Sequence, residues 1–521
     1  MPHFCCCRAA AVKMNLDRSL ESRDMSDVAV SRLAVAALSA VVAIWVAYAV
    51  RTHSVAVAEA APAAPCPLSP IAITSSIPQD TSQTSQTYFD CFAWQEFIGL
   101  NWDADPAHAG APNPSAPASA FGKPLDLAPP VFESYADALD VFKPGAPPPS
   151  KWGTIDPSPC AIHGMASGPG RRVLRMSSIV APDFQAPNGV RQAFPASGPS
   201  WLADRDGNMV WYQILIDKDE FEYIVDKQYY DADRQLQAIT SDGRIDMPEG
   251  ESGGALGSIE IKAAWVPISD PARQKRYRMQ HAIILDADGG CHAVNVGLVA
   301  LHIIHKTQSQ PTWVWSTFEH VDDAPSAGAT PSGNFLFSRP ACHPSPIPAS
   351  CQLPRHGTQT SCDPNNPPAY MPSAYFTKKA ACPIYPIQVT HENPGDPTAT
   401  AISAYVASLI RAQNPTSVYQ YYRLVNVLWA SNSADPNAGP SPPIEPVLVN
   451  GITPPTTQPV ANVVTETYAQ QMTCLSCHAN ARIAKAADEL PKWKPYFSDF
   501  SFILSQAHTP APQPSHPAPL P

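Results

Sequence analysis

The chain has 521 residues, of which 15% are charged and 60 are proline, and its formal net charge at pH 7 is −11. Because 44% of the residues are hydrophobic, as in ordinary globular proteins, the proline excess indicates loop-rich connections around a core rather than wholesale disorder. The length allows one large domain or two, and an acidic chain without a long basic run offers no track for phosphates, so we expect no nucleic-acid partner.

The N-terminal residues 1–61 are interpreted as a leader. An uninterrupted apolar run without charges spans residues 33–50 between Arg32 and Arg51, and small residues suitable for cleavage follow it. The run predicts an export signal, although it is longer than a typical signal core and just short of a spanning helix. We favour a cleaved signal; the alternative is a retained anchor that tethers the chain to a membrane through residues 33–50. Both place the body of the chain in a periplasmic or other extracytoplasmic compartment.

Cysteine usage is informative in an exported chain, because disulfides persist in oxidising compartments. Three of the 13 cysteines precede the export signal and two belong to a Cys-x-x-Cys pair near the C-terminal end, which leaves eight. An even number fits up to four disulfides, whose pairing the sequence leaves open. The eight are Cys66, Cys91, Cys160, Cys291, Cys342, Cys351, Cys362 and Cys382.

A linker rich in Ala, Pro, Ser, Thr and Gln is predicted at 62–87, before a body that spans residues 88–458. The first element of the body is an amphipathic helix at 88–102, because large apolar residues recur there at helical spacing. Loops with turn signals follow to residue 160.

Alternating and β-branched patterns predict a series of strands in the centre of the body, with a helical patch at 217–239. These strands, with helices on either side, predict an α+β fold with a β-rich central body. The predicted strands are 208–216, 257–265, 277–285, 293–306 and 312–320.

The last part of the chain returns to helices. A segment rich in Pro and Cys at 322–395 lacks apolar periodicity, and two helices are predicted after it, at 399–413 and 418–431. A Pro-rich connector then leads to a helical segment at 459–505 that packs on the body. Residues 506–521 form a Pro-rich tail that cannot build a core and is predicted to be disordered.

The C-terminal segment carries Cys474, Cys477 and His478 in the order Cys-x-x-Cys-His, the attachment pattern of a c-type haem. The two thiols can add to the two haem vinyl groups, the spacer sets their separation, and the adjacent imidazole then reaches the iron. The motif therefore predicts one covalent haem c, held by Cys474 and Cys477, with His478 as the iron ligand.

Three other interpretations of this motif are a redox dithiol, half of a zinc site, and a chance match. A dithiol gains nothing from a His directly after the second Cys, and it belongs early in a βαβ unit. A zinc site needs further ligands at short spacing, and no second pair follows Cys477. Haem attachment is therefore the preferred interpretation for an exported chain.

The position of the motif predicts what surrounds the haem. Few residues follow His478, and the last of them form the tail, so the preceding β-rich body must cover the haem. A cytochrome domain rearranged from residues 399–505 is the competing possibility.

The distal side of the haem has three tentative pocket residues, His302, His305 and His320, on the last two predicted strands. If these strands pair as a hairpin, the loop length places His302 and His320 on one face with Ser316 and Phe318. Hydrogen-bonded core histidines are the alternative. Further candidate axial ligands are Met165, Met176 and Met279.

Several stretches together resemble a group of bacterial exported c-type haem proteins described only as cytochrome c family proteins. The resemblance covers roughly residues 88–505 and implies export and a haem held by Cys474, Cys477 and His478, but it implies no particular reaction. The matching stretches are 92–102, 260–265, 297–321, 462–479 and 497–504.

Functions from different classes remain open. The preferred one is electron transfer by an exported mono-haem cytochrome whose body docks a redox partner protein of unknown identity. The alternative is a peroxidase- or oxygenase-like enzyme with an open distal site, in which one of the three histidines acts as acid–base group. A haem-based sensor or binding protein is the third. The large body favours a substrate or partner site, whereas the absence of a recognisable catalytic constellation favours electron transfer.

Overall fold

A computed structural model describes only part of the chain, all of it within the compact unit that begins at Ala64. The leader, the cysteines between 342 and 382, the connector at 435–459 and Cys477 lie outside the described residues. The described residues are 65–67, 69–81, 85–157, 160–161, 164–168, 171–174, 202, 204–206, 208–251, 253–285, 290–326, 335–338, 389, 391, 396–429, 461–467, 470, 473–474, 478, 481–485 and 498–511.

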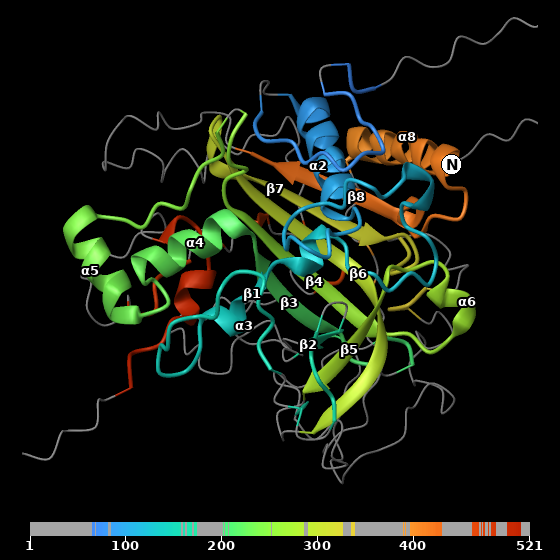
Figure 1. Ribbon diagram of the computed structural model, residues 1–521. Coiled ribbons are helices and arrows are strands. Elements are labelled where there is room, and N and C mark those ends of the chain that lie inside the picture. The colour runs from blue at the N-terminus through green and yellow to red at the C-terminus, as the bar shows by residue number, and fades with distance from the viewer. Residues whose placement is uncertain are drawn as a thin grey trace, which may run out of the picture. The chain divides into compact units, whose positions relative to one another are not determined.

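One mixed sheet organises the described residues, and it contains eight strands (Figure 1). Its strand order is β1-β3-β4-β6-β5-β2, and β7 pairs with both β6 and β8. Every pair is antiparallel except β2 with β5. The strands are β1 (Ala136–Asp137), β2 (Arg171–Leu174), β3 (Trp211–Ile216), β4 (Ile259–Pro267), β5 (Met279–Leu285), β6 (Cys291–Thr307), β7 (Gln310–His320) and β8 (Tyr422–Leu428).

The centre of the sheet is β6, which has 17 residues. Its first half pairs with β5 and its second half with β7, while β4 runs along its other edge. Helices surround this sheet, so the predicted α+β class is confirmed. They are α2 (Gln86–Leu100), α3 (Ala138–Val141), α4 (Lys218–Lys227), α5 (Ala232–Asp242), α6 (Pro271–Gln274) and α8 (Pro397–Gln413), with 3-10 turns at Ala118–Ala120, Val131–Ser134, Val418–Tyr421 and Ile503–Gln506.

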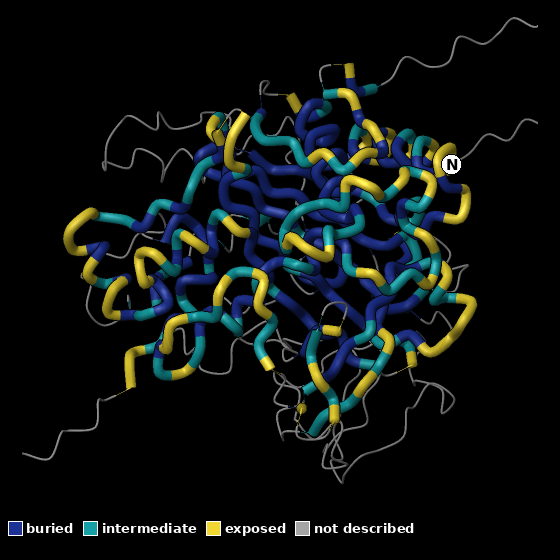
Figure 2. Tube along the Cα trace, viewed as in Figure 1, coloured by how far each residue is buried: buried dark blue, intermediate teal, exposed yellow. Residues whose placement is uncertain are grey.

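The two faces of the sheet carry different hydrophobic clusters. Side chains such as Ile303 and Val314 pack with α2 and α8, and we call this the α2 face. Their neighbours Ile304 and Trp315 point to the opposite side, because successive residues of a strand alternate, and they pack with residues near the C-terminus. We call that side the C-terminal face. Figure 2 shows that the strands between the two layers are buried along most of their length.

The predicted first helix is confirmed by α2, which starts where the Ser85 hydroxyl accepts a hydrogen bond from the Tyr88 amide. Its predicted amphipathic character is wrong. All residues of α2 except Thr87 are buried, because α8 covers one side and the segment with Ile71 and Ile73 covers another. A helix enclosed on all sides can be apolar all round.

Part of the predicted linker is packed rather than extended in solvent. Cys66 forms a disulfide with Cys91 in α2, and both side chains are buried. A second disulfide joins Cys160 to Cys291 at the start of β6. Two of the expected disulfides are thus present among the described residues.

The five predicted strands are confirmed by β3 to β7, the helical patch by α4 and α5, and the helix at 399–413 by α8. The helix predicted at 418–431 is wrong, because its apolar residues form β8 after a single 3-10 turn. β8 is buried on both sides, so its sequence shows no alternation that would mark it as a strand. The start of the predicted disordered tail is also ordered: the Ala232 amide donates to the His508 carbonyl.

The described residues at the two ends of the Pro- and Cys-rich segment are neighbours in the fold. The Val389 amide donates to the Phe337 carbonyl at 2.9 Å, and Ser326 pairs with His391 in an isolated bridge. Both ends of this segment are therefore fixed beside each other. Within the described part of the chain, no helix has the length and apolarity needed to cross a membrane.

Candidate functional site

The residues around the Cys-x-x-Cys-His motif lie on the C-terminal face of the sheet. Phe500, Ile503 and Leu504 are buried there in one cluster with Trp313 and Trp315, and the partly buried Cys474 packs against the same cluster. The β-rich body therefore covers the motif region, as the position of the motif predicts.

Among the described residues, His478 has one hydrogen bond, to a backbone carbonyl. Its Nδ1 lies 2.8 Å from the carbonyl oxygen of Phe500, which can only accept, so Nδ1 carries the proton. Nε2 has no hydrogen-bond partner among the described residues. Burial is the main cause that lowers the pKa of His478 to about 4, so the ring is neutral at pH 7. A neutral imidazole with a proton on Nδ1 presents a lone pair at Nε2.

Two aromatic rings pack against His478 edge to face. The ring centroid of Trp315 is 4.7 Å from that of His478, and the centroid of Phe502 is 5.0 Å away. These contacts restrict the orientation of the imidazole and exclude water from its sides.

The carbonyl that accepts from His478 belongs to a strained turn. Asp499 and Phe500 have positive φ angles of 51° and 61°, which residues with a Cβ rarely adopt. Two successive carbonyls of the turn accept hydrogen bonds, that of Asp499 from Trp313 Nε1 of β7 at 3.0 Å and that of Phe500 from His478. Strained backbone of this kind persists only where the surroundings fix it.

A buried ion pair fixes this turn. Lys306 on β6 is fully buried, and its Nζ lies 2.6 Å from Asp246 Oδ1 and 2.6 Å from Asp499 Oδ2. The Met247 amide also donates to Asp499 Oδ2. The position of the Phe500 carbonyl is thus set from the central strand of the sheet.

A polar cluster lies on the same face as His478. His302 Nε2 is 2.6 Å from the Thr465 hydroxyl and 3.1 Å from Glu466 Oε1, and Lys262 Nζ lies 4.0 Å from the same carboxylate oxygen. Burial opposes ionisation of Glu466, but His302 and Lys262 outweigh it and hold the pKa of this carboxyl at about 2. Lys262 and His302 also contribute to the lowered pKa of His478.

The bonding pattern fixes the proton on His302. The Thr465 hydroxyl donates to Glu466, so it accepts from the imidazole, and Nε2 of His302 is the protonated nitrogen. Nδ1 of His302 has no partner among the residues that the structure describes.

The predicted hairpin register between β6 and β7 is wrong by one residue. His302 pairs with Thr317, and Leu301 pairs with Phe318, so Ser316 and Phe318 point to the α2 face, away from His302. The cause is an irregularity between His305 and Thr307 next to a tight turn, which loop length alone does not reveal. A slip of one residue exchanges the two faces of a strand.

His305 and His320 are not brought together with His478. His305 points to the α2 face, where its Nδ1 lies 2.7 Å from Glu96 Oε1 and its Nε2 lies 2.8 Å from the Leu256 carbonyl. His320 donates from Nε2 to the Arg276 carbonyl, and its Nδ1 accepts from the Asp322 amide. Both rings thus use both nitrogens within the protein, and only His302 lies on the face of the motif.

Several neighbours of the motif were not singled out from the sequence. Lys262 and Glu466 lie in stretches that carry the family resemblance, but no role followed for them until the fold brought β4 next to residues 461–467, and the Phe500 carbonyl is a backbone group without a sequence signal. Trp315 lies in a stretch that carries the family resemblance, which was its only signal. Among the described residues, no group of three or more His, Cys, Asp or Glu side chains could hold a metal ion by themselves.

No protein-family model, curated protein or solved structure matches this chain.

Proposed function

We propose that this chain is an exported mono-haem c-type cytochrome that transfers electrons to or from a partner protein. Cys474 and Cys477 would form the two thioether bonds, and His478 would bind the iron through Nε2. The bound haem would supply a ferric–ferrous couple.

The observation that carries this proposal is the hydrogen bond from His478 Nδ1 to the Phe500 carbonyl. Histidines that bind a metal through one ring nitrogen commonly donate from the other to a carbonyl or carboxylate, which fixes the tautomer and raises the basicity of the ligand. The core histidine His320 has both ring nitrogens hydrogen-bonded within the protein, whereas the described residues leave Nε2 of the partly buried His478 without a partner.

The residues around His478 support the same role. Trp315 and Phe502 hold the ring and exclude water, and the Lys306–Asp499 ion pair holds the turn that carries the accepting carbonyl. An apolar, rigid surrounding suits electron transfer, because less reorganisation accompanies a change of charge where few waters and side chains can move.

The haem-dependent enzyme is the second candidate, and the His302–Glu466 pair favours it. An imidazole that is oriented by a carboxylate and keeps one nitrogen without a partner has the parts of a general acid–base group. In that role, His302 would move a proton at Nδ1.

An optical spectrum of the full chain, produced together with haem-maturation machinery, tests both candidates. It would be recorded ferric, ferrous and ferrous with carbon monoxide, alongside a pyridine haemochrome. We expect covalent haem and a low-spin ferrous spectrum that carbon monoxide leaves unchanged. A high-spin spectrum that shifts with carbon monoxide would favour the enzyme or a sensor, and absence of covalent haem would refute both.

A further inference from the structure

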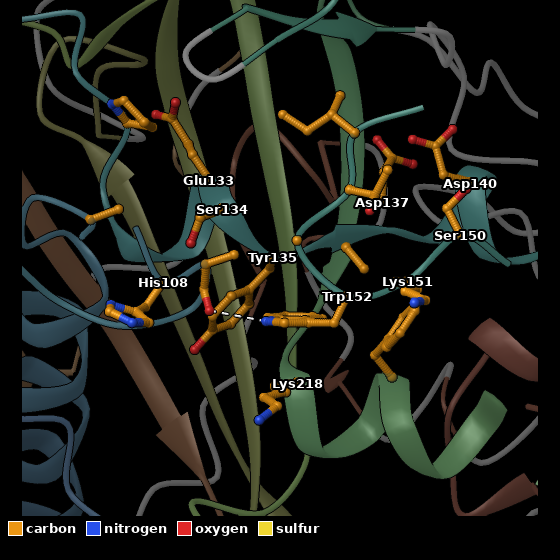
Figure 3. A pocket seen from close by; sticks show the side chains of 18 of the residues that line it. His108, Glu133, Ser134, Tyr135, Asp137, Asp140, Ser150, Lys151, Trp152 and Lys218 are labelled. Carbon is orange, nitrogen blue, oxygen red and sulfur yellow. Dashed lines mark hydrogen bonds between the residues drawn. The ribbon is translucent and has the colours of Figure 1, made fainter. Parts of the chain in front are cut away.

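Lys306, on the central strand β6, is a fully buried lysine. Its side chain is 1% exposed. Lys151 and Lys218, which line an open cavity of about 700 Å³, are instead exposed to solvent, as lysines normally are (Figure 3). A lysine enclosed by the core has lost its rotamer freedom, so its Nζ atom stays beside the same neighbours.

Two carboxyl groups from distant parts of the chain meet at this Nζ atom. It lies 2.6 Å from Oδ2 of Asp499, in the strained C-terminal turn, and 2.6 Å from Oδ1 of Asp246, in the loop after α5. Because Oδ2 is bonded directly to Cγ of Asp499, a small rotation of this carboxyl group brings Nζ to the separation of about 3–3.5 Å from which bond formation begins. An amine, a carboxyl carbon and a second carboxylate are thus held together.

The two carboxyl groups differ in the way that a condensation requires. Asp499 is 6% exposed, and burial is the main cause that raises its pKa to about 7, so near neutral pH it is often protonated. The Met247 amide donates to Oδ2 of Asp499 at 3.0 Å and would stabilise negative charge that develops on this oxygen.

Asp246 has the properties of a proton acceptor. Its side chain is 40% exposed. Burial opposes its ionisation, but the charges of Lys306 and Arg244 outweigh burial and lower the pKa of this carboxyl. It therefore stays ionised, in contact with the ammonium group whose proton has to be removed.

We propose that Lys306 and Asp499 condense to an intramolecular amide that joins β6 to the C-terminal turn. Asp246 accepts one proton from the ammonium group, the freed Nζ attacks Cγ of Asp499, and the proton then passes to the carboxyl oxygen that leaves. One N–C bond forms and one C–O bond breaks. Of the three ammonium protons, one stays on the amide nitrogen and two leave with the oxygen as water, so nothing is oxidised or reduced.

The surroundings determine how fast this condensation proceeds. Burial opposes the charge on Lys306, but Asp499 and Asp246 outweigh it and raise the pKa of the amine, so the neutral form is rare and the bond forms slowly, once per chain. Fixed contact compensates for this, because oriented groups within one molecule react with effective concentrations of up to about 10⁵–10⁸ M. The proposed bond does not depend on haem attachment.

A covalent bond at this position would also account for the turn that carries it. Asp499 and Phe500 keep positive φ angles of 51° and 61°. Such backbone persists only where its surroundings determine it, and an amide holds the Asp499 side chain more firmly than a reversible ion pair does.

Tandem mass spectrometry of the full, folded chain tests the proposal. After reduction of the disulfides and digestion with trypsin, we expect a branched peptide in which Lys306 is joined to Asp499, lighter by one water than its two parts together. Trypsin should not cut after Lys306, because its amine is acylated. Unlinked peptides alone, after long incubation of the folded chain, would overturn the proposal. A branch to Asp246 would overturn the assignment of Asp499 as the acceptor.

Variants separate the roles of the three side chains. Lys306→Arg keeps the positive charge but has no amine that can be freed, so the branched peptide should be absent. Asp246→Asn, at a partly exposed position, removes the proton acceptor and should slow formation of the bond by about a hundredfold, followed at increasing times after synthesis.

Glu249→Gln is the matched control for Asp246→Asn. It removes a nearby carboxylate that acts on Lys306 through its charge, and the rate of bond formation should stay close to that of the parent. Far-ultraviolet circular dichroism checks that each variant is folded. Formation of the bond in Asp246→Asn at the rate of the parent, or equal slowing in Asp246→Asn and Glu249→Gln, would overturn the role of Asp246.

Discussion

His305 Nδ1 lies 2.7 Å from Glu96 Oε1, and both side chains are fully buried between β6 and α2. This ion pair joins the central strand of the sheet to the helix that covers it. Burial alone would lower the pKa of His305, but the neighbouring Glu96 carboxylate outweighs burial and raises the pKa above 6.5. His305 is therefore held on the α2 face by Glu96 and lies away from His478.

Glu96→Gln should lower the free energy of unfolding by about 3 kcal/mol, because it leaves a buried imidazole without its counter-charge. The raised pKa of His305 makes this contribution complete below pH 6.5 and removes it as the pH rises through the folded-state value. Urea unfolding at about pH 6 and about pH 9 checks both statements. A loss in Glu96→Gln that is larger at the alkaline pH would contradict the sign.

The motif variants test the proposed haem attachment. Cys474→Ser with Cys477→Ser should abolish the covalent haem seen in the pyridine haemochrome, since both thioethers are lost. His478→Ala should keep the thioethers but change the ferric and ferrous spectra, because the axial ligand is gone. His305→Gln is the matched histidine control, and we expect its haem spectrum to equal that of the parent. If His478→Ala and the parent give the same spectrum, His478 is not the iron ligand.

A buried carboxyl pair makes stability depend on pH. Glu260 of β4 and Glu220 of α4 lie together on the C-terminal face, and burial raises the pKa of both, that of Glu260 to about 7. Between the unfolded value near 4.5 and about 7, the folded chain keeps a proton that the unfolded chain has lost, so stability falls as the pH rises through this window.

Glu260→Gln replaces the protonated acid by a neutral amide and should relieve this loss. The variant should gain about 1–3 kcal/mol over the parent above pH 7, and no more than a few tenths near pH 4. Denaturant titrations across this range measure the difference. Glu222→Gln, at an exposed position of α4, serves as control, and its free energy of unfolding should depend on pH as that of the parent does. A gain for Glu260→Gln that is greatest at acid pH would refute the account.

The two disulfides close loops of very different length. Cys66 and Cys91 are 25 residues apart, whereas Cys160 and Cys291 are 131 apart. In the chain-entropy model, the longer loop contributes about 5 kcal/mol and the shorter about 3.5 kcal/mol. Paired Cys→Ser variants of each bridge, compared by urea unfolding, should show a larger loss for Cys160 with Cys291. The reverse order would show that native packing at Cys91 outweighs loop entropy.

Much of the sheet could be predicted from the sequence, because β3 to β7 carry alternating or β-branched patterns next to clear turns. Strand β8 could not be predicted, because its apolar residues fit the spacing of a helix as well as the pattern of a strand buried on both sides. These residues are Tyr422, Leu424, Val425 and Leu428. Its partner β7 lies about a hundred residues earlier, so only tertiary pairing decides between the two.

Only the part of the candidate site that consists of a local side-chain motif could be predicted from the sequence. Cys474, Cys477 and His478 follow from one local motif. The choice among His302, His305 and His320 depended on a hairpin register, and the irregularity between His305 and Thr307 changed it. The Phe500 carbonyl is a backbone group in a strained turn, and a sequence pattern does not mark such a group.

The hydrogen bond between Phe337 and Val389 has a consequence for how this chain tolerates change in length. Because these residues meet, a short flexible connection could join them without moving the described residues on either side. Each doubling of a flexible loop costs only about 0.6 kcal/mol. A short Gly-Ser bridge between Ser338 and Val389 should therefore leave the sheet in place, and the far-ultraviolet circular dichroism of the shortened chain measures this.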